Sequence, residues 1–338
     1  MIARIATVAT LALAIVACEP VDSPSANGLS HGDPRPACQE NRDPNRVAYY
    51  RQPESLLSSW NPPDPVQAPV TDDCPNDAIT LSADGSTLYF FWSPVVGGEP
   101  AELLDAATGT YVATRTGDDP AQFGEPTYYA LQVGAENASV DGALSFAPDG
   151  TEVIFHSTRA DNLGYQAEPA TDDFLDMYIA DIIDGVPQQA VNLGEPANSV
   201  NLDGEHGLHP DGERLFFASD RPGGYGGTDI WVTRRTADGW SEPEVLPPPI
   251  NTPANEAQPA FPANHPEVMY FMSDRDGPAS IYRTDESDGS WSQPGMVITG
   301  YVGEPTPNAD NTVLYFVHVL VDDAGVFGSN IWFIAANP

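Results

Sequence analysis

The amino-acid sequence predicts an all-β fold, and three observations support that prediction. The 338 residues include 34 prolines and 29 glycines, which leave little room for long helices. Hydrophobic residues make up 41% of the chain and aromatic residues 9%, enough to build a buried core. The third observation is a short motif that recurs five times, in the form of two strands joined by a tight turn.

Each copy of the motif has a short strand, a turn at Asp-Gly or a related pair, and a second strand with a constant aromatic residue. The turn residues lie 65, 62, 53 and 46 residues apart and are Asp84, Asp149, Asp211, Asn264 and Asp310. The constant aromatic residues are Phe90, Phe155, Phe217, Phe271 and Phe316. Asp-Gly favours tight hairpin turns, and aromatic residues suit half-buried strands. Each repeat therefore begins with a β-hairpin.

Further strands are expected after each hairpin. Third strands are predicted at Tyr111–Thr114, Met177–Ala180, Asp229–Thr233, Ser280–Tyr282 and Asn330–Ile334, and fourth strands within TYYALQV, PQQAVNL and PEVLPPP. About four short antiparallel strands per repeat at this period predict a β-propeller. The last repeat ends at its third strand, so we expect residues 47–69 to supply the strand that closes the ring. Five blades are preferred, and six, with an extra blade in residues 47–70, are the alternative.

The beginning of the chain is typical of a secreted bacterial lipoprotein. Residues 1–17 carry one Arg followed by a short apolar run, and Ile15-Val16-Ala17-Cys18 resembles the lipobox, in which the Cys is acylated. An ordinary secretory signal with an incidental Cys18 is the alternative. Glu19 follows the Cys, which by analogy with enterobacterial lipoproteins indicates the outer membrane. Residues 18–46 are rich in Pro, Ser and Asn and predict a flexible tether, which leaves residues 47–338 for the propeller.

One repeat resembles a known family. The segment Ser219–Phe261, which begins SDRPGGYGGTDIWV, is similar to the WD40-like β-propeller repeat of TolB-like periplasmic proteins. The resemblance implies a non-enzymatic scaffold in the cell envelope that binds an envelope protein or a cell-wall glycan. It also implies that Asp and Arg of the Ser-Asp-Arg runs pair with each other, with a ligand role for Arg221 and Arg275 at the channel mouth as a secondary reading.

Charge and cysteine content limit the partners and the compartment. The chain has 49 acidic and 13 basic residues, a formal net charge of -36, and no lysine. Such a field repels polyanions and excludes nucleic acid as a partner. Besides Cys18, the chain has Cys38 and Cys74, which in an oxidising compartment are expected to form one disulfide.

Acidic residues recur near the start of the innermost strand of each repeat. These residues are Asp77, Asp141, Glu205, Glu256 and Glu304. Because innermost strands line the channel of a propeller, the pattern predicts a ring of carboxylates at one channel mouth, able to hold Ca²⁺ or a basic group of a partner. The alternative is that these side chains cap turns and hydrate loops.

No local motif indicates catalysis. The chain has no G-x-S-x-G or H-E-x-x-H sequence, so no catalytic residue is assigned. Two hypotheses remain, a lipid-anchored binding scaffold and, as the alternative, a glycoside-active enzyme that uses two channel carboxylates. The scaffold is preferred because no repeat carries a distinct catalytic motif.

Overall fold

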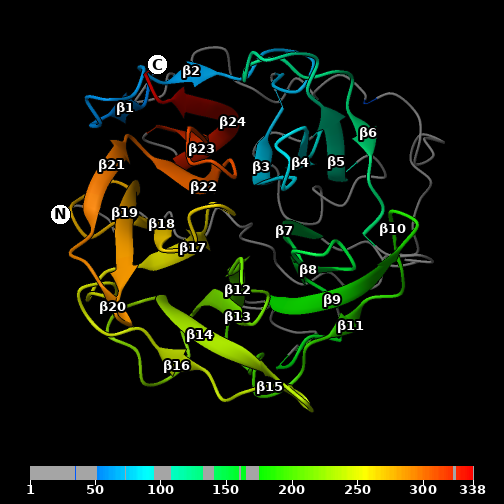
Figure 1. Cartoon of the computed structure of the whole chain (residues 1–338), viewed down its shortest axis with the longest axis vertical. Coiled ribbons are helices and arrows are strands. Elements are labelled where there is room, and N and C mark those ends of the chain that lie inside the picture. Colours follow the sequence, from blue (N-terminus) through cyan, green and yellow to red (C-terminus); the bar gives the residue numbers. More distant parts are fainter. Residues whose placement is uncertain are drawn as a thin grey trace.

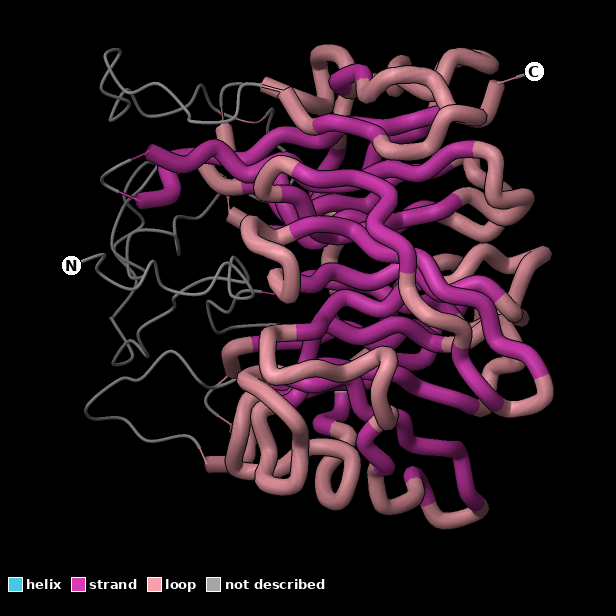
Figure 2. Tube along the Cα trace, turned by 90° about the vertical axis from the view of Figure 1, so that its left-hand side faces the viewer, coloured by secondary structure: helices cyan, strands magenta, loops and turns pink. Residues whose placement is uncertain are grey.

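The protein is a five-bladed β-propeller. The computed structural model describes residues 35, 52–72, 74–94, 108–131, 141–159, 161–164, 175–322 and 325–337. Figure 1 shows five small sheets arranged around a common centre, and Figure 2 shows that the described chain consists of strands and loops. No helix long and apolar enough to cross a membrane occurs in this part of the chain. The preference for five blades over six is confirmed.

The first three blades follow the predicted order of strands. The first contains β3 (Asn76–Leu81), β4 (Thr87–Trp92), β5 (Gly109–Thr114) and β6 (Thr127–Tyr128). The second contains β7 (Asp141–Phe146), β8 (Glu152–Ser157) and β9 (Asp176–Ile183), with β10 (Val186–Pro187) and β11 (Val191–Asn192) both paired to β9. The third contains β12 (Asp203–Leu208), β13 (Arg214–Ser219) and β14 (Asp229–Thr236), with β15 (Gly239–Trp240) and β16 (Glu244–Val245) both paired to β14.

The last two blades each take a strand from the N-terminal part of the chain. The fourth blade contains β17 (Glu256–Ala260), β18 (Val268–Ser273), β19 (Ser280–Ser287), β20 (Ser290–Trp291) and β21 (Gly295–Thr299), and β1 (Glu54–Ser55) pairs with β21. The fifth contains β22 (Val302–Pro307), β23 (Val313–Asp322) and β24 (Gly325–Ala335), and β2 (Asp64–Pro65) pairs with β24. The predicted closure of the last blade by residues 47–69 is therefore confirmed, and the same segment extends the fourth blade as well.

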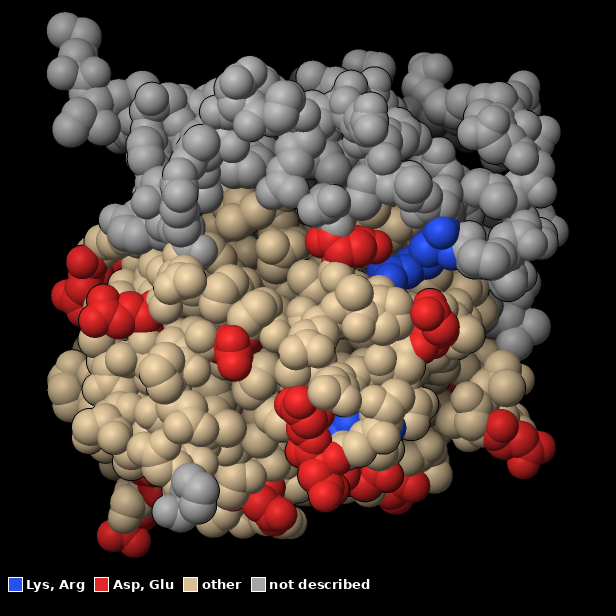
Figure 3. All heavy atoms as spheres, turned by 90° about the horizontal axis from the view of Figure 1, so that it is seen from above, with Lys and Arg blue, Asp and Glu red and all other residues tan. Residues whose placement is uncertain are grey.

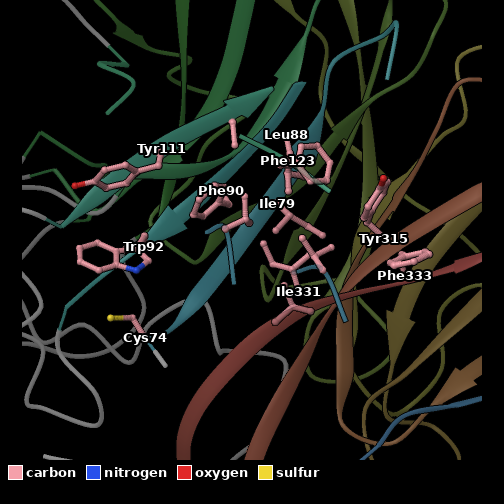
Figure 4. Packing of buried hydrophobic residues seen from close by; sticks show 14 of the residues in the cluster. Cys74, Ile79, Leu88, Phe90, Trp92, Tyr111, Phe123, Tyr315, Ile331 and Phe333 are labelled. Atoms are coloured by element: carbon pink, nitrogen blue, oxygen red, sulfur yellow. The ribbon is translucent and has the colours of Figure 1, made fainter. Parts of the chain in front are cut away.

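The constant aromatic residue of each hairpin forms the centre of its blade. All five of these phenylalanines are fully buried. Each pairs across the sheet with an aromatic residue of the third strand, as Phe90 does with Tyr111 and Phe217 with Trp231. The ring is sealed by a hydrophobic cluster that joins the first and last blades, where Phe123 packs on Tyr315 with ring centroids 6.1 Å apart (Figure 4). Burial of such large side chains is the main favourable contribution to folding.

Adjacent blades approach most closely along the innermost strands, β3, β7, β12, β17 and β22. The Thr306 hydroxyl donates to the Ile79 carbonyl across one blade boundary, and the Thr80 hydroxyl donates to the Leu144 carbonyl across the next. At the corresponding position of the third blade, a Cβ atom on Gly207 would lie only 2.0 Å from the Pro259 carbonyl oxygen. Glycine is required there because the backbones of two blades nearly touch. These contacts fix the geometry of the channel.

Candidate functional site

A cavity of about 290 Å³ occupies the centre of the propeller, and all five innermost strands line it. At its inner end lie the buried side chains of Glu205 and Glu304. Its walls are largely apolar and include Leu144, Leu208 and Phe261. Lining residues become exposed toward the turns that follow the innermost strands, at Ala83, Pro148 and Ala263. The cavity therefore opens on the face that carries the hairpin turns.

Every innermost strand contains a β-bulge, and in four of the five blades the bulged residue lines the cavity. The register shifts by one residue at the same place in all five blades. The residues there, here named the bulge ring, are Ala78, Ala143, Glu205, Gln258 and Glu304, with φ between 47° and 58°. Left-handed backbone conformations are costly for residues other than glycine and concentrate at functional sites. Two small and three polar side chains make one half of the ring open and the other half hydrogen-bonding.

Three neighbouring buried carboxyl groups, here called the acid trio, belong to Asp77, Glu205 and Glu304. Glu205 and Glu304 line the cavity, and Asp77 lies near enough for its charge to act on Glu304. All three are at least nine-tenths buried. Burial raises the pKa of Asp77 to about 8, with a further increase from the charge of Glu205. Burial likewise raises the pKa of Glu205 to about 7. The pKa of Glu304 is raised well above its usual value by burial and by the neighbouring charges of Glu205 and Asp77.

The acid trio has no counter-ion among the described residues. No ion pair joins any of its members to a described Arg or His side chain. His156 and His206 lie nearby, but burial lowers their pKa to about 3 and about 4, so both are neutral at neutral pH. Buried carboxyl groups without a cation hold their protons, because isolated buried charge is costly.

Gln258 and Glu205 differ in the hydrogen bonds that their side chains make. The Gln258 amide donates to Glu304 Oε1 at 2.7 Å and accepts from the Glu304 backbone N–H at 2.8 Å. Neither carboxyl oxygen of Glu205 makes a hydrogen bond of good geometry with the described residues, although Gln258 and Glu304 lie close enough to affect its pKa. Glu205 is 3% exposed. A buried carboxyl group that lines a cavity in this state is available to a ligand.

The predicted ring of five carboxylates is only partly correct. Glu205 and Glu304 belong to the bulge ring, and Asp77 lies one residue before it. Asp141 and Glu256 instead begin their strands, two residues before the bulge, where they pair with arginines. The distance from Arg159 to Asp141 is 2.9 Å, and that from Arg275 to Glu256 is 3.3 Å. Each of these ion pairs lies within one blade, and both carboxylates lie outside the cavity lining.

Arg221 and Arg275 each tie their own blade to the segment that leads into it, and neither lines the cavity. Arg221 binds Asp203 at 2.5 Å and donates to the carbonyls of Pro196 and Ala197, while its guanidinium lies over the rings of Phe217 and Trp231. The expected partner, Asp220, accepts instead from the Leu202 backbone N–H. The pairing of Asp with Arg inside the Ser-Asp-Arg run is therefore wrong, because the guanidinium reaches back to the innermost strand.

Arg35 takes the same role in the first blade, which has no arginine of its own at this place. Its guanidinium lies over the rings of Phe90, Trp92 and Tyr111, at 5.7, 5.1 and 5.8 Å from the ring centroids. It donates to the carbonyls of Pro69 and Val70, which correspond to those that Arg221 binds in the third blade. Its carboxylate partner is Asp72, at 3.6 Å. A residue of the predicted tether thus completes a blade.

Sequence reasoning missed Asp203, Gln258 and Arg35, although a signal for the first two exists. The residues six positions before the five turn residues are the members of the bulge ring. The residues eight positions before them are Asn76, Asp141, Asp203, Glu256 and Val302. The predicted acidic ring mixed offsets of six, seven and eight. Arg35 has no such signal, because it reaches its site from outside the repeats.

Cys18 and Cys38 lie outside the described residues, so acylation and the pairing of Cys38 with Cys74 stay predictions. Cys74 itself is buried and disulfide-bonded. Within the described ranges, no three His, Cys, Asp or Glu side chains come together in a way that could hold a metal ion.

Comparison with known proteins finds likeness at the level of the fold. No protein-family model and no curated protein matches the chain. A protein of unknown function from Dyadobacter fermentans is 12% identical over 85% of this chain and 100% of its own, with a TM-score of 0.48. A putative TolB from Agrobacterium tumefaciens is 15% identical over 78% and 90%, with a TM-score of 0.40. An alpha-L-arabinofuranosidase from Lactobacillus brevis is 11% identical over 76% and 90%, with a TM-score of 0.41.

Proposed function

We propose that this propeller is a non-enzymatic binding protein of the bacterial cell envelope, anchored by lipid at Cys18, which receives a group of a protein partner in the central cavity. The observation that carries the proposal is Glu205, a buried carboxyl group that lines the cavity without a hydrogen bond of good geometry. Fold alone assigns no function to a propeller, so the proposal depends on this site.

The size of the cavity favours a single side chain over a polymer. Pockets for drug-sized ligands begin at about 300 Å³, and this cavity lies at that lower limit. It has room for one side chain of a partner, whereas an oligosaccharide would extend beyond it. A protein partner is therefore preferred over a cell-wall glycan.

The arrangement of the carboxyl groups favours binding over glycoside hydrolysis. Glycosidases hold their two carboxyl groups about 5 to 9.5 Å apart, so that a sugar or a water fits between them. In this cavity the charge of Glu205 raises the pKa of Glu304, so the two buried carboxyl groups oppose each other's ionisation. A glycosidase needs one carboxyl group of its pair ionised, as base or nucleophile, and this arrangement disfavours that state.

The charge of the whole chain supports a basic partner. Figure 3 shows Asp and Glu side chains spread over one face of the molecule, with few arginines among them. The net charge of -36 extends this field over the entire protein. An acidic surface raises the association rate of a cationic partner and steers it to the channel.

The proposal is tested by blocking the mouth of the cavity. Ala83→Trp and Ala263→Trp place bulk at exposed lining positions without disturbing the core. Ala237→Trp, in the exposed turn between β14 and β15, is the matched control. Partners captured by the full lipidated protein from solubilised envelope are identified by mass spectrometry and glycan analysis. We expect both mouth variants to lose protein partners that the control retains; equal capture by all three, or capture of glycan alone, would contradict the proposal.

A further inference from the structure

We infer that the cavity takes an aliphatic ammonium group, the chemistry of a lysine side chain or a small alkylamine. The inference rests on the proposed function and goes further by naming the ligand chemistry. It follows from the acid trio, from the cavity walls and from the way in which the protein uses its own cations.

Two sets of buried carboxyl groups in this protein differ in how they are neutralised. Asp203 and Glu256 are fully buried, and each is neutralised by an arginine that belongs to the chain. The acid trio is buried to a similar degree but has no such partner among the described residues. The carboxylates at the start of these two innermost strands thus receive a cation from their own chain. Asp176 and Asp229 are also buried without an arginine, but each accepts backbone or amide hydrogen bonds. Glu205 differs from all of these, because it makes no hydrogen bond of good geometry with the described residues and lines the cavity.

The shape of the site favours an ammonium over a guanidinium. The arginines that occupy the equivalent place in four blades lie over two or three aromatic rings, as Arg275 does over Phe271 and Tyr282. The inner end of the cavity has no such pair, and its aliphatic walls include Leu144 and Leu208. A lysine side chain has an apolar stem and a compact head with three hydrogen-bond donors. The stem fits these walls, and the head can reach Glu205 and Glu304.

The side chains of this protein cannot provide an ammonium group. It has no lysine, and all 13 of its basic residues are arginines. An ammonium group in the cavity must come from another molecule. Ala78 and Ala143, the two small members of the bulge ring, leave the opposite side of the channel free of bulky side chains at the level where the head group would lie.

Binding of a cation here is coupled to release of a proton. The titratable groups that face the site are Asp77 on β3, Glu205 and His206 on β12, and Glu304 on β22; Gln258 on β17 and Ala143 on β7 do not titrate. Behind them, His156 on β8 accepts a hydrogen bond from the Glu205 backbone N–H, and His318 on β23 pairs with Val302. The histidines that titrate near this site lose their charge well below neutral pH. Deprotonation of the acid trio is therefore the event that prepares the site for a cation, and affinity should rise with pH.

Isothermal titration calorimetry on the full chain tests the inference with n-hexylammonium chloride and, as its neutral isostere, n-hexanol. We expect the amine to bind at least about tenfold more tightly than the alcohol at slightly alkaline pH, as charged hydrogen bonds imply. In the range below neutral pH, the affinity for the amine should increase by up to about tenfold for each unit by which the pH is raised. Release of a proton on binding should appear as a binding enthalpy that depends on the buffer. A peptide with one lysine is then compared with the same peptide acetylated at Nε. Tighter binding of the unmodified peptide would show that a lysine side chain enters the cavity as the small amine does.

Glu205→Gln identifies the group responsible, because it keeps the shape of the side chain and removes its charge. It should reduce hexylammonium affinity at least about tenfold and leave hexanol binding unchanged. Glu244→Gln, on exposed β16, is the control and should change neither. Equal binding of amine and alcohol, or calcium chloride binding in place of the amine, would overturn the ammonium assignment while leaving a cavity that binds ligands. Failure of every probe would overturn the inference alone, since the mouth-blocking variants test the proposed function separately.

Discussion

At the scale of single residues, the acid trio exists because the first repeat has Asp77 at a position where the other four repeats have a small residue. The residue before each bulge is Gly142, Gly204 or Gly303 in three blades and Ala257 in a fourth. A Cβ on Gly142 would lie 2.7 Å from Ala78 Cβ, and one on Gly303 would lie 2.6 Å from the Gln258 side chain. Asp77 is the exception, and its charge raises the pKa of Glu304 in the adjacent blade. A position that otherwise serves close packing thus carries a third carboxyl group.

The raised pKa values predict a specific dependence of stability on pH. The folded state of the empty protein keeps protons on Asp77 and Glu205 up to about pH 8 and about pH 7, whereas the unfolded chain releases them near pH 4. Their contribution is therefore fully present below about pH 4 and is lost as pH rises toward 8, at up to about 1.4 kcal/mol per pH unit for each proton. Glu205→Gln should flatten this loss and make the variant more stable than wild type at pH 8.

Urea unfolding of wild type, Glu205→Gln and the surface control Glu244→Gln over this pH range measures the effect. A wild-type protein whose stability relative to Glu205→Gln does not change between pH 5 and pH 8 would show that the carboxyl group is already ionised in the folded state.

The sequence predicts where these acidic residues recur along the chain. It does not predict which groups surround each of them in the fold. Recurrence marks Glu205 and Glu304 because they precede their turns by the same number of residues. Asp141 and Glu256 look equivalent in the sequence, but the bulge adds a residue to the strand between the two positions. Side chains on opposite sides of a bulge face different surroundings, so a shift of two residues separates a cavity group from an ion pair.

At the scale of elements, the local sequence predicts the hairpins and the closure of the last blade. It does not predict the contacts that the arginines make. Hydrophobic alternation and turn residues specify each hairpin within a dozen residues, which is why the five second strands were predicted correctly. Closure by β2 follows from a count of strands in the last repeat. Arg35 contacts residues at least 34 positions away, and no local pattern encodes such a contact.

Arg35→Ala should destabilise the protein by about 2 kcal/mol, the combined scale of a desolvated cation–π contact and hydrogen bonds to carbonyls. Arg221→Ala should cost more, about 3 to 5 kcal/mol, because it leaves the fully buried Asp203 without a cation. Urea denaturation measures both, with exposed Arg234→Ala as the control. If Arg35→Ala unfolds like the control, residue 35 makes no energetically important contact with the first blade.

The same segment predicts where the disulfide lies. Arg35 contacts Pro69, Val70 and Asp72, so the chain just before Cys38 lies beside the chain just before Cys74. A bond between the two cysteines, 36 residues apart, should stabilise the fold by about 3 to 4 kcal/mol in the chain-entropy model. Intact mass after alkylation without reductant should show no free thiol in the mature lipidated protein. Two alkylated cysteines would contradict the pairing.

At the scale of the whole molecule, the fold uses its few cations internally and leaves its surface acidic. Among the described arginines, Arg159, Arg221 and Arg275 each pair with a carboxylate at the start of the innermost strand of their own blade, and each lies over buried aromatic rings. The 49 acidic residues far outnumber them. A protein of this charge is repelled by anionic lipid, and the lipid proposed at Cys18 would provide an attachment that does not depend on charge.

Cys18→Ser should therefore abolish membrane attachment, because it removes the thiol on which the lipid is built. Metabolic labelling with a fatty-acid analogue and fractionation of the envelope measure the effect, and Cys38→Ser controls for loss of a thiol elsewhere. We expect label on wild type and Cys38→Ser and none on Cys18→Ser. Label that persists in the Cys18→Ser protein would remove the lipid anchor from the proposed function.

We expect the cavity to hold protonated carboxyl groups whose protons a bound cation displaces, and their protonation can be observed directly. Carbon-13 NMR of protein labelled at the Asp and Glu carboxyl carbons, titrated through neutral pH, assigns the trio by comparison with Asp77→Asn, Glu205→Gln and Glu304→Gln. We predict resonances of Asp77 and Glu205 that titrate at about pH 8 and about pH 7, and that ionise at lower pH when hexylammonium is present. Titration of all three near pH 4 in the empty protein, unchanged by the amine, would contradict the account.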